Sequence, residues 1–133
     1  MTDDLSITSS QSGGKANVTV FHLSGTLDAA SEDALYKQAC QAFDSGAQYL
    51  LLDMQNLKHI SSAGLRALHN IFKKCTSEEE FEAARGSGEP YKSPYFKLAS
   101  APPEVYYVLN IAGFLHNIPF YPTMEDALKS FEN

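Results

Sequence analysis

The feature that most constrains the fold is a change of hydrophobic period near the middle of the chain. The run Tyr-Leu-Leu-Leu at residues 49–52 is short, apolar and bounded by polar residues, as expected of a buried strand. Beyond it, apolar residues recur at the spacing of one helix face, at Leu65, Leu68, Phe72 and Cys75. The two patterns predict a strand over residues 49–53, and then a helix that begins near Ser61 or Ser62.

The segments on either side alternate between strand and helix patterns. Alternating or β-branched runs predict further strands at residues 5–8, 18–23, 95–99 and 118–121. Helical patterns follow Asp28, Pro102 and Thr123, and each begins with residues typical of a first helical turn. We expect Gly25 to end the second strand and Asp53 to end the third.

This order of elements predicts an α/β fold. We expect a mixed sheet of about five strands, mostly parallel in its later part, with about four helices packed on it. The first two strands should form a hairpin around a turn at residues 11–15. A length of 133 residues fits one domain over residues 1–133. Residues 76–94 interrupt the pattern with glutamates, glycines and prolines, which predicts a polar loop inserted at the surface.

Composition and charge restrict the class of protein. Acidic residues outnumber basic ones to give a formal net charge of -6, which argues against general nucleic-acid binding. The N-terminus lacks the basic region and apolar core of a signal peptide, and no apolar run is long enough to span a membrane. Cys40 and Cys75 fall on apolar helix faces, which favours buried thiols over a disulfide. We therefore expect a cytoplasmic protein that binds no nucleic acid and does not insert into membranes.

The motifs of common enzyme classes are missing from the sequence. It contains no Gly-x-Ser-x-Gly, no Gly-x-Gly-x-x-Gly and no Gly-Lys-Ser/Thr. The histidines follow no zinc-ligand spacing, and no pattern ties them to Ser62 and an acid. We expect no catalytic residue, no metal site and no cofactor. What remains is Ser61 and Ser62 at a predicted helix start, where a serine can be an N-cap or can accept a phosphate close to unpaired N–H groups.

Three stretches in order resemble the STAS domain family, of the anti-sigma factor antagonist type. Residues 53–65 read Asp-Met-x-x-Leu-x-x-Ile-Ser-Ser-Ala-Gly-Leu and resemble the family's phosphorylation-site motif. Upstream, Gly-Thr-Leu-Asp at residues 25–28 looks like the family's Gly-x-Leu-Asp turn. Downstream, Phe-Lys-Leu-Ala-Ser at residues 96–100 precedes a helix in the expected position. The resemblance covers nearly the whole chain except residues 76–94.

The resemblance implies a regulatory binding protein that is switched by serine phosphorylation. The family register places the acceptor at Ser62, with Ser61 as the second choice, and Ser61 stands where the family usually has an acidic residue. The unmodified form would bind an anti-sigma factor with serine kinase activity, the phosphorylated form would let go, and a protein phosphatase would reverse the modification. The implied partner-binding surface consists of Asp28, Ser61, Ser62, Ala63, Gly64 and Arg66.

Two further expectations concern assembly. We expect a monomer or a weak dimer. An alternative to the switch is an unphosphorylated STAS subunit of a larger transport or stress-signalling complex.

Overall fold

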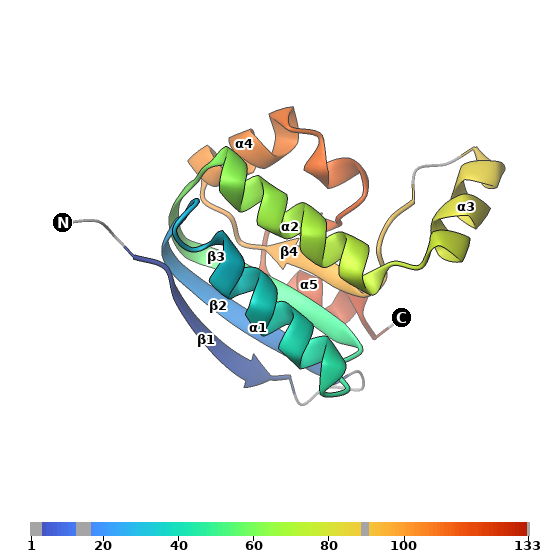
Figure 1. The fold of residues 1–133 in the computed structure, drawn as a ribbon, viewed down its shortest axis with the longest axis horizontal. Coiled ribbons are helices and arrows are strands. Elements are labelled where there is room, and N and C mark those ends of the chain that lie inside the picture. Colours follow the sequence, from blue (N-terminus) through green and yellow to red (C-terminus); the bar gives the residue numbers. More distant parts are fainter. Residues whose placement is uncertain (1–3, 13–16, 89–90, 133) are drawn as a thin grey trace.

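The computed structural model describes residues 4–12, 17–88 and 91–132, which form a sheet covered by helices (Figure 1). The strands are β1 (Ser6–Gln11), β2 (Val18–Leu27), β3 (Tyr49–Ile60), β4 (Phe96–Ala99) and β5 (Phe120–Tyr121). They lie in that order across the sheet; β1 pairs with β2 antiparallel, and the other three pairings are parallel. This confirms the predicted mixed, mostly parallel sheet. The predicted turn at residues 11–15 and the predicted insertion lie partly outside the described residues.

Helices cover both faces of the sheet. They are α1 (Glu32–Asp44), α2 (Ser62–Cys75), α3 (Glu78–Ser87), α4 (Pro103–Ile111) and α5 (Met124–Ser130), with a 3-10 turn at Phe114–His116. The helices α1, α2 and α4 share a buried cluster on one face, whereas α5 packs on the opposite face (Figure 1). The described residues thus form five α-helices where the sequence predicts about four. Within this part of the chain, no helix combines the length and the apolar character needed to cross a bilayer.

The strand β3 is shared by both layers of the core. Leu50 and Leu52 lie in the same cluster as Leu35 of α1. Leu51 points to the other face and lies in the cluster that contains Ala127 of α5. Leu50, Leu51 and Leu52 are fully buried, and each contributes about 1.5–3 kcal/mol by leaving water. This burial on both faces confirms the strand predicted from the apolar run.

Two strands run further than the sequence predicts. The strand β2 continues through Gly25 to Leu27, and β3 continues past Asp53 to Ile60. Gly25 has a φ of 99°, which glycine adopts without strain, and the β2–β3 pairing shifts its register beside it. The predictions that Gly25 and Asp53 end their strands are therefore wrong, because the pairing of β2 with β3 continues beyond both residues. The longer ladder brings Leu27 and Ile60 side by side just before α2.

The segment predicted as a loop contains α3. Its first turn carries Glu78, Glu79 and Glu80, whose negative charges suit the positive end of the helix dipole. The Oγ of Ser77 accepts the backbone N–H of Glu80 at 3.1 Å, as in a capping box. Beyond the helix, the hydroxyl of Tyr91 donates to Oε2 of Glu80 at 3.0 Å. These contacts explain why a polar segment rich in glycine and proline nevertheless begins as a helix.

The first turn of α2 contacts the end of β2 at Gly64. A Cβ on this glycine would lie 2.7 Å from the carbonyl oxygen of Leu27 and 2.8 Å from Cγ1 of Ile60. These separations are shorter than van der Waals contact, so a residue without a Cβ lets the helix start come this close to the sheet. The N–H of Ser61 donates to the same Leu27 oxygen at 3.0 Å. Gly64 therefore sets the position of the two serines relative to β2.

Gly64→Ala should lower the free energy of unfolding by about 1–3 kcal/mol, because the added methyl group must displace a backbone oxygen. Gly86→Ala is the matched control, since Gly86 also lies in a helix and a Cβ there meets nothing within 4 Å. This control should be unchanged, or more stable by up to about 1 kcal/mol. Urea unfolding followed by circular dichroism measures both variants, and equal stabilities would contradict the close contact at Gly64.

Candidate functional site

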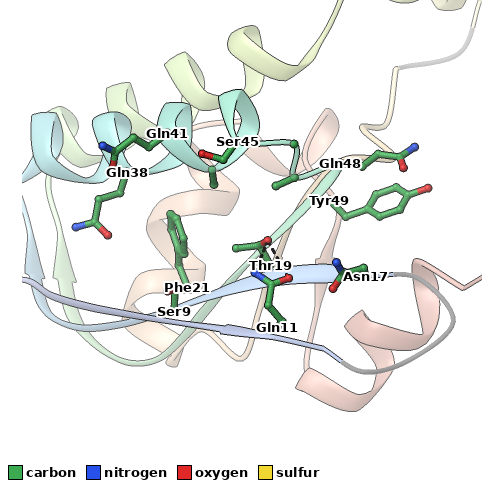
Figure 2. A pocket seen from close by; sticks show the side chains of 13 residues that line it. Ser9, Gln11, Asn17, Thr19, Phe21, Gln38, Gln41, Ser45, Gln48 and Tyr49 are labelled. Atoms are coloured by element: carbon green, nitrogen blue, oxygen red, sulfur yellow. Dashed lines mark hydrogen bonds between the residues drawn. The ribbon is translucent and has the colours of Figure 1, made fainter.

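A groove of about 790 Å³ lies between α1 and the strands β1 and β2 (Figure 2). Its lining is polar but uncharged, with Gln11, Gln38 and Gln41 at its sides and the ring of Phe21 beneath α1. None of the predicted site residues lines it. Within the described ranges, no three His, Cys, Asp or Glu side chains gather closely enough to hold a metal ion. The predicted site lies instead at the start of α2.

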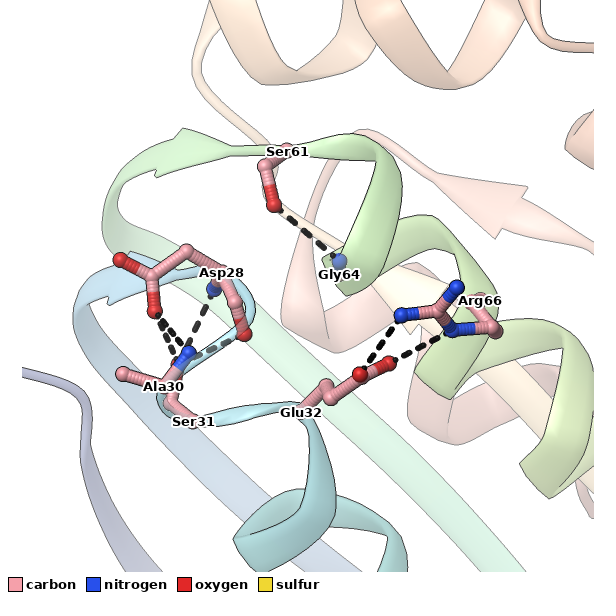
Figure 3. Close-up of polar contacts among 7 residues, drawn as sticks. All are labelled: Asp28, Ala30, Ser31, Glu32, Ser61, Gly64 and Arg66. Carbon is pink, nitrogen blue, oxygen red and sulfur yellow. Dashed lines mark hydrogen bonds and ion pairs between the residues drawn. The ribbon is translucent and has the colours of Figure 1, made fainter.

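The ends of β2 and β3 bring two turns together at this place (Figure 3). The first turn follows Leu27 and contains Asp28, and the second contains Ser61. The hydrogen bond from the Ser61 N–H to the Leu27 carbonyl joins them. Residues far apart in the sequence thereby form one surface, which we call the Ser62 corner. It consists of the Asp28 turn, the starts of α1 and α2, and the side chain of Arg66.

Ser61 is the N-cap of α2. Its backbone is extended, with φ -98° and ψ 177°, and its Oγ accepts the N–H of Gly64 at 3.3 Å. Ser62 is the first helical residue and is exposed. The N–H groups of Ser62 and Ala63 have no intrahelical acceptor at these positions. The two serines therefore differ: the oxygen of Ser61 serves the helix, whereas Ser62 offers its hydroxyl to solvent.

The Asp28 turn is held by its own hydrogen bonds. The Asp28 carbonyl accepts the N–H groups of Ser31 and Glu32 at 3.1 and 2.8 Å. Its Oδ1 accepts from the N–H of Ala30 and the hydroxyl of Ser31, both at 3.1 Å. Ser31 stands at the N-cap position of α1 without capping the helix, and its oxygen accepts the Asp28 N–H at 3.0 Å instead. Asp28 is thus part of the structure of this turn as well as partly exposed.

Arg66 joins the starts of α1 and α2. Its Nε donates to Glu32 Oε2 at 3.0 Å, and its Nη2 donates to Glu32 Oε1 at 2.7 Å, which makes the pair bidentate (Figure 3). The hydrogen bond to Arg66 lowers the pKa of Glu32, and the same bond raises the pKa of Arg66. The Arg66 side chain is 63% exposed, so water competes for the pair, and it holds the two helices only weakly.

The residues predicted to bind a partner meet in this corner but differ in exposure. Ser62 and Arg66 are exposed, Asp28, Ser61 and Ala63 are partly buried, and Gly64 is buried. The contribution of Gly64 is the close approach of α2 to β2. The side chains available to a partner are therefore chiefly those of Ser62 and Arg66.

A hydrogen-bonded chain of serine, histidine and aspartate lies elsewhere, across β1, β2 and β3. His22 Nδ1 lies 2.8 Å from Asp53 Oδ2, and His22 Nε2 lies 3.0 Å from Ser10 Oγ. An ionised carboxylate only accepts hydrogen bonds, so in the neutral imidazole Nδ1 carries the proton and Nε2 accepts the Ser10 hydroxyl. Sequence reasoning missed this chain because its three residues lie on separate strands, and only the strand register brings them together. In the structure, the parallel register of β2 and β3 places His22 opposite Asp53.

The surroundings of this chain differ from those of a serine hydrolase. A nucleophilic serine needs backbone N–H donors gathered around the oxyanion, as on a sharp turn. Ser10 lies instead within the regular ladder of β1, in register with Val20 of β2. Asp53 also accepts the N–H of Gln55 at 3.1 Å. We interpret the chain as a tie that holds the first three strands together.

Comparisons with known proteins support this fold. The STAS domain family matches residues 11–79. An anti-sigma factor antagonist from Mycobacterium paratuberculosis is similar with a TM-score of 0.73 and 22% identity, over 96% of this chain and 96% of that chain. The anti-sigma factor antagonist SpoIIAA in its unphosphorylated form is similar with a TM-score of 0.66 and 17% identity, over 97% and 96% of the two chains.

A phosphorylated protein has a similar structure as well. The Bacillus cell fate determinant SpoIIAA in the phosphorylated form gives a TM-score of 0.58 at 16% identity, over 92% of this chain and 97% of that chain. At these identities the likeness shows the fold alone. No curated protein matches the sequence.

Ser61→Ala should lower the free energy of unfolding by about 1 kcal/mol, because the N–H of Gly64 loses its acceptor. Ser62→Ala should change it little. Ser62→Asp should be neutral, or more stable by about 0.3–1 kcal/mol, because a negative charge at the first helical position meets the positive end of the dipole. Thermal and urea unfolding measure all three variants. A large loss of stability in Ser62→Asp would show that the fold does not tolerate an anion there.

Ser10→Ala and Ser62→Ala should leave any background hydrolysis of p-nitrophenyl acetate unchanged. The reason is that Ser10 lies in a regular strand, without the sharp turn that gathers oxyanion donors, and Ser62 lies at an exposed helix start. His22→Ala is the control that removes the imidazole bonded to Ser10. Initial rates at equal protein concentration are compared, and a rate that disappears in Ser10→Ala and His22→Ala would contradict the interpretation as a structural tie.

Proposed function

Since the chain belongs to the STAS domain family, we propose that it is a regulatory protein of the anti-sigma factor antagonist type, switched by phosphorylation of Ser62. The unmodified form binds an anti-sigma factor that has serine kinase activity. The phosphorylated form releases this partner, and a protein phosphatase restores the unmodified form. The cycle takes place in the cytoplasm and needs no cofactor of its own.

The observation that carries this proposal is the division of roles between two adjacent serines. Ser61 caps α2, so its oxygen is committed to the N–H of Gly64. Ser62 is exposed and follows the cap, so its hydroxyl is accessible to a kinase. A phosphate on Ser62 lies near the first N–H groups of the helix and the positive end of its dipole. The fold can accept the modification and keep its cap.

The effect of the phosphate falls on the partner. It adds a charge of about -2 to a corner that the partner must cover. Burying such a charge without a matching cation is costly, and the dissociation constant rises tenfold for every ~1.4 kcal/mol of lost binding energy. SpoIIAA, which shares the fold, has both an unphosphorylated and a phosphorylated form, and this supports a reversible modification here.

The residue before the acceptor distinguishes this chain from the usual family motif. An acidic residue is usual at that position, and here Ser61 provides a neutral cap. The nearby carboxylate of Asp28 is engaged by Ala30 and Ser31 in its own turn. A kinase partner of this chain must therefore accept a neutral residue before its target serine.

A pull-down from lysate of the native cells tests the switch, with wild type, Ser61→Ala, Ser62→Ala and Ser62→Asp as baits. Ser62→Asp should lose a kinase-type partner that wild type and Ser62→Ala retain, because it places a negative charge in the interface. Ser61→Ala should also retain the partner, since it removes a cap and adds no charge. Mass spectrometry of the protein isolated from its own cells should find the phosphate on Ser62.

Two results would contradict this proposal. Equal recovery of the same proteins by all four baits would favour the alternative, an unphosphorylated subunit of a larger transport or stress-signalling complex. Phosphate found on Ser61 and not on Ser62 would show that the capping residue is the acceptor. This would contradict the assignment of Ser61 as the cap and Ser62 as the phosphorylated residue.

A further inference from the structure

Arg66 lies one helical turn after Ser62 on the same side of α2. Side chains four residues apart on a helix are neighbours. The Cα–Cβ bonds of a helix lean toward its N-terminus, so the Arg66 side chain starts out toward Ser62. Both residues are exposed. A guanidinium group thus stands within side-chain reach of a phosphate placed on Ser62.

In the unmodified chain this guanidinium is occupied by Glu32. The two hydrogen bonds between them, of 3.0 and 2.7 Å, account for the lowered pKa of Glu32. The Arg66 side chain is 63% exposed, so it can reorient and water competes for its guanidinium, whereas the Glu32 side chain is 22% exposed. Arg66 can therefore exchange Glu32 for a stronger anion that comes within its reach.

We propose that a phosphate on Ser62 pairs with Arg66 and displaces Glu32, so that phosphorylation also changes the start of α1. This inference rests on the proposed function. The phosphate brings a charge of about -1.5 to -2 and three acceptor oxygens, against one charge and two oxygens for Glu32. It also meets the N–H groups of Ser62 and Ala63, which have no intrahelical acceptor. Arg66 therefore completes a set of donors that the helix start already provides in part.

The exchange changes the Ser62 corner at two places. The guanidinium moves back over the first turn of α2, and the carboxylate of Glu32 is released to solvent. Glu32 tolerates this release because it lies in the first turn of α1, where the helix dipole favours a negative charge. The Asp28 turn keeps its own bonds to Ser31. A partner would thus lose the exposed Arg66 as a donor and meet a free Glu32 in addition to the phosphate.

Phosphoserine installed at position 62 during translation tests the exchange without any kinase. The pKa of the phosphate is read from its phosphorus NMR shift as the pH is changed. Arg66 should hold this pKa about 0.5 below the value in Arg66→Gln, and Glu32→Gln should lower it further because the competing carboxylate is gone. Lys129→Gln removes the lysine of an exposed i,i+4 pair on α5, on the opposite face, and should leave the pKa unchanged.

The double variant of Glu32→Gln and Arg66→Gln separates competition from a simple charge effect. If Glu32 competes for Arg66, Glu32→Gln should lower the phosphate pKa when Arg66 is present and have little effect when it is absent. Equal effects in both backgrounds would overturn the proposal, and so would the same pKa in wild type and Arg66→Gln. Neither result bears on partner release, which the pull-down measures separately.

Discussion

The candidate site depends on one contact, between the first turn of α2 and the last residue of β2. The carbonyl of Leu27 accepts the N–H of Ser61, and the same oxygen lies against Gly64. The Leu27 carbonyl therefore lies at the end of the β2–β3 ladder and also fixes the position of the first turn of α2. A bulkier residue at position 64 would move α2 as a unit, because a packed interface does not yield locally. The exposure of Ser62 and the reach of Arg66 would change with it.

The buried elements of the fold were predictable from the sequence, and their ends were not. The leucines at residues 50–52 indicate a buried strand because nothing polar interrupts them. Gly25 and Asp53 resemble strand ends when read locally, yet pairing between β2 and β3 extends both strands beyond them. At α3, the glycines and prolines near residues 86–94 suggest a loop, whereas the decisive signal is the short capping pattern from Ser77 to Glu80.

For the candidate site, position was predictable and contacts were not. Ser61 and Ser62 follow a strand and precede a helical period, which is enough to place them at a helix start. The pair of Arg66 and Glu32 depends on how α1 and α2 lie beside each other on the sheet. The register and packing of separate elements determine such side-chain pairs, including His22 with Asp53. The spacing of residues along the chain does not predict them.

The hydrogen bond between Ser61 and Leu27 has a consequence for the order of events during folding. It closes a loop that contains all of α1, so it forms only after that length of chain has been brought back on itself. Closing a long loop for parallel strand pairing is a slow, entropically costly step. In a chain that has not completed it, Ser62 does not yet lie beside the end of β2. The Ser62 corner is therefore complete only in molecules in which β2 and β3 have already paired.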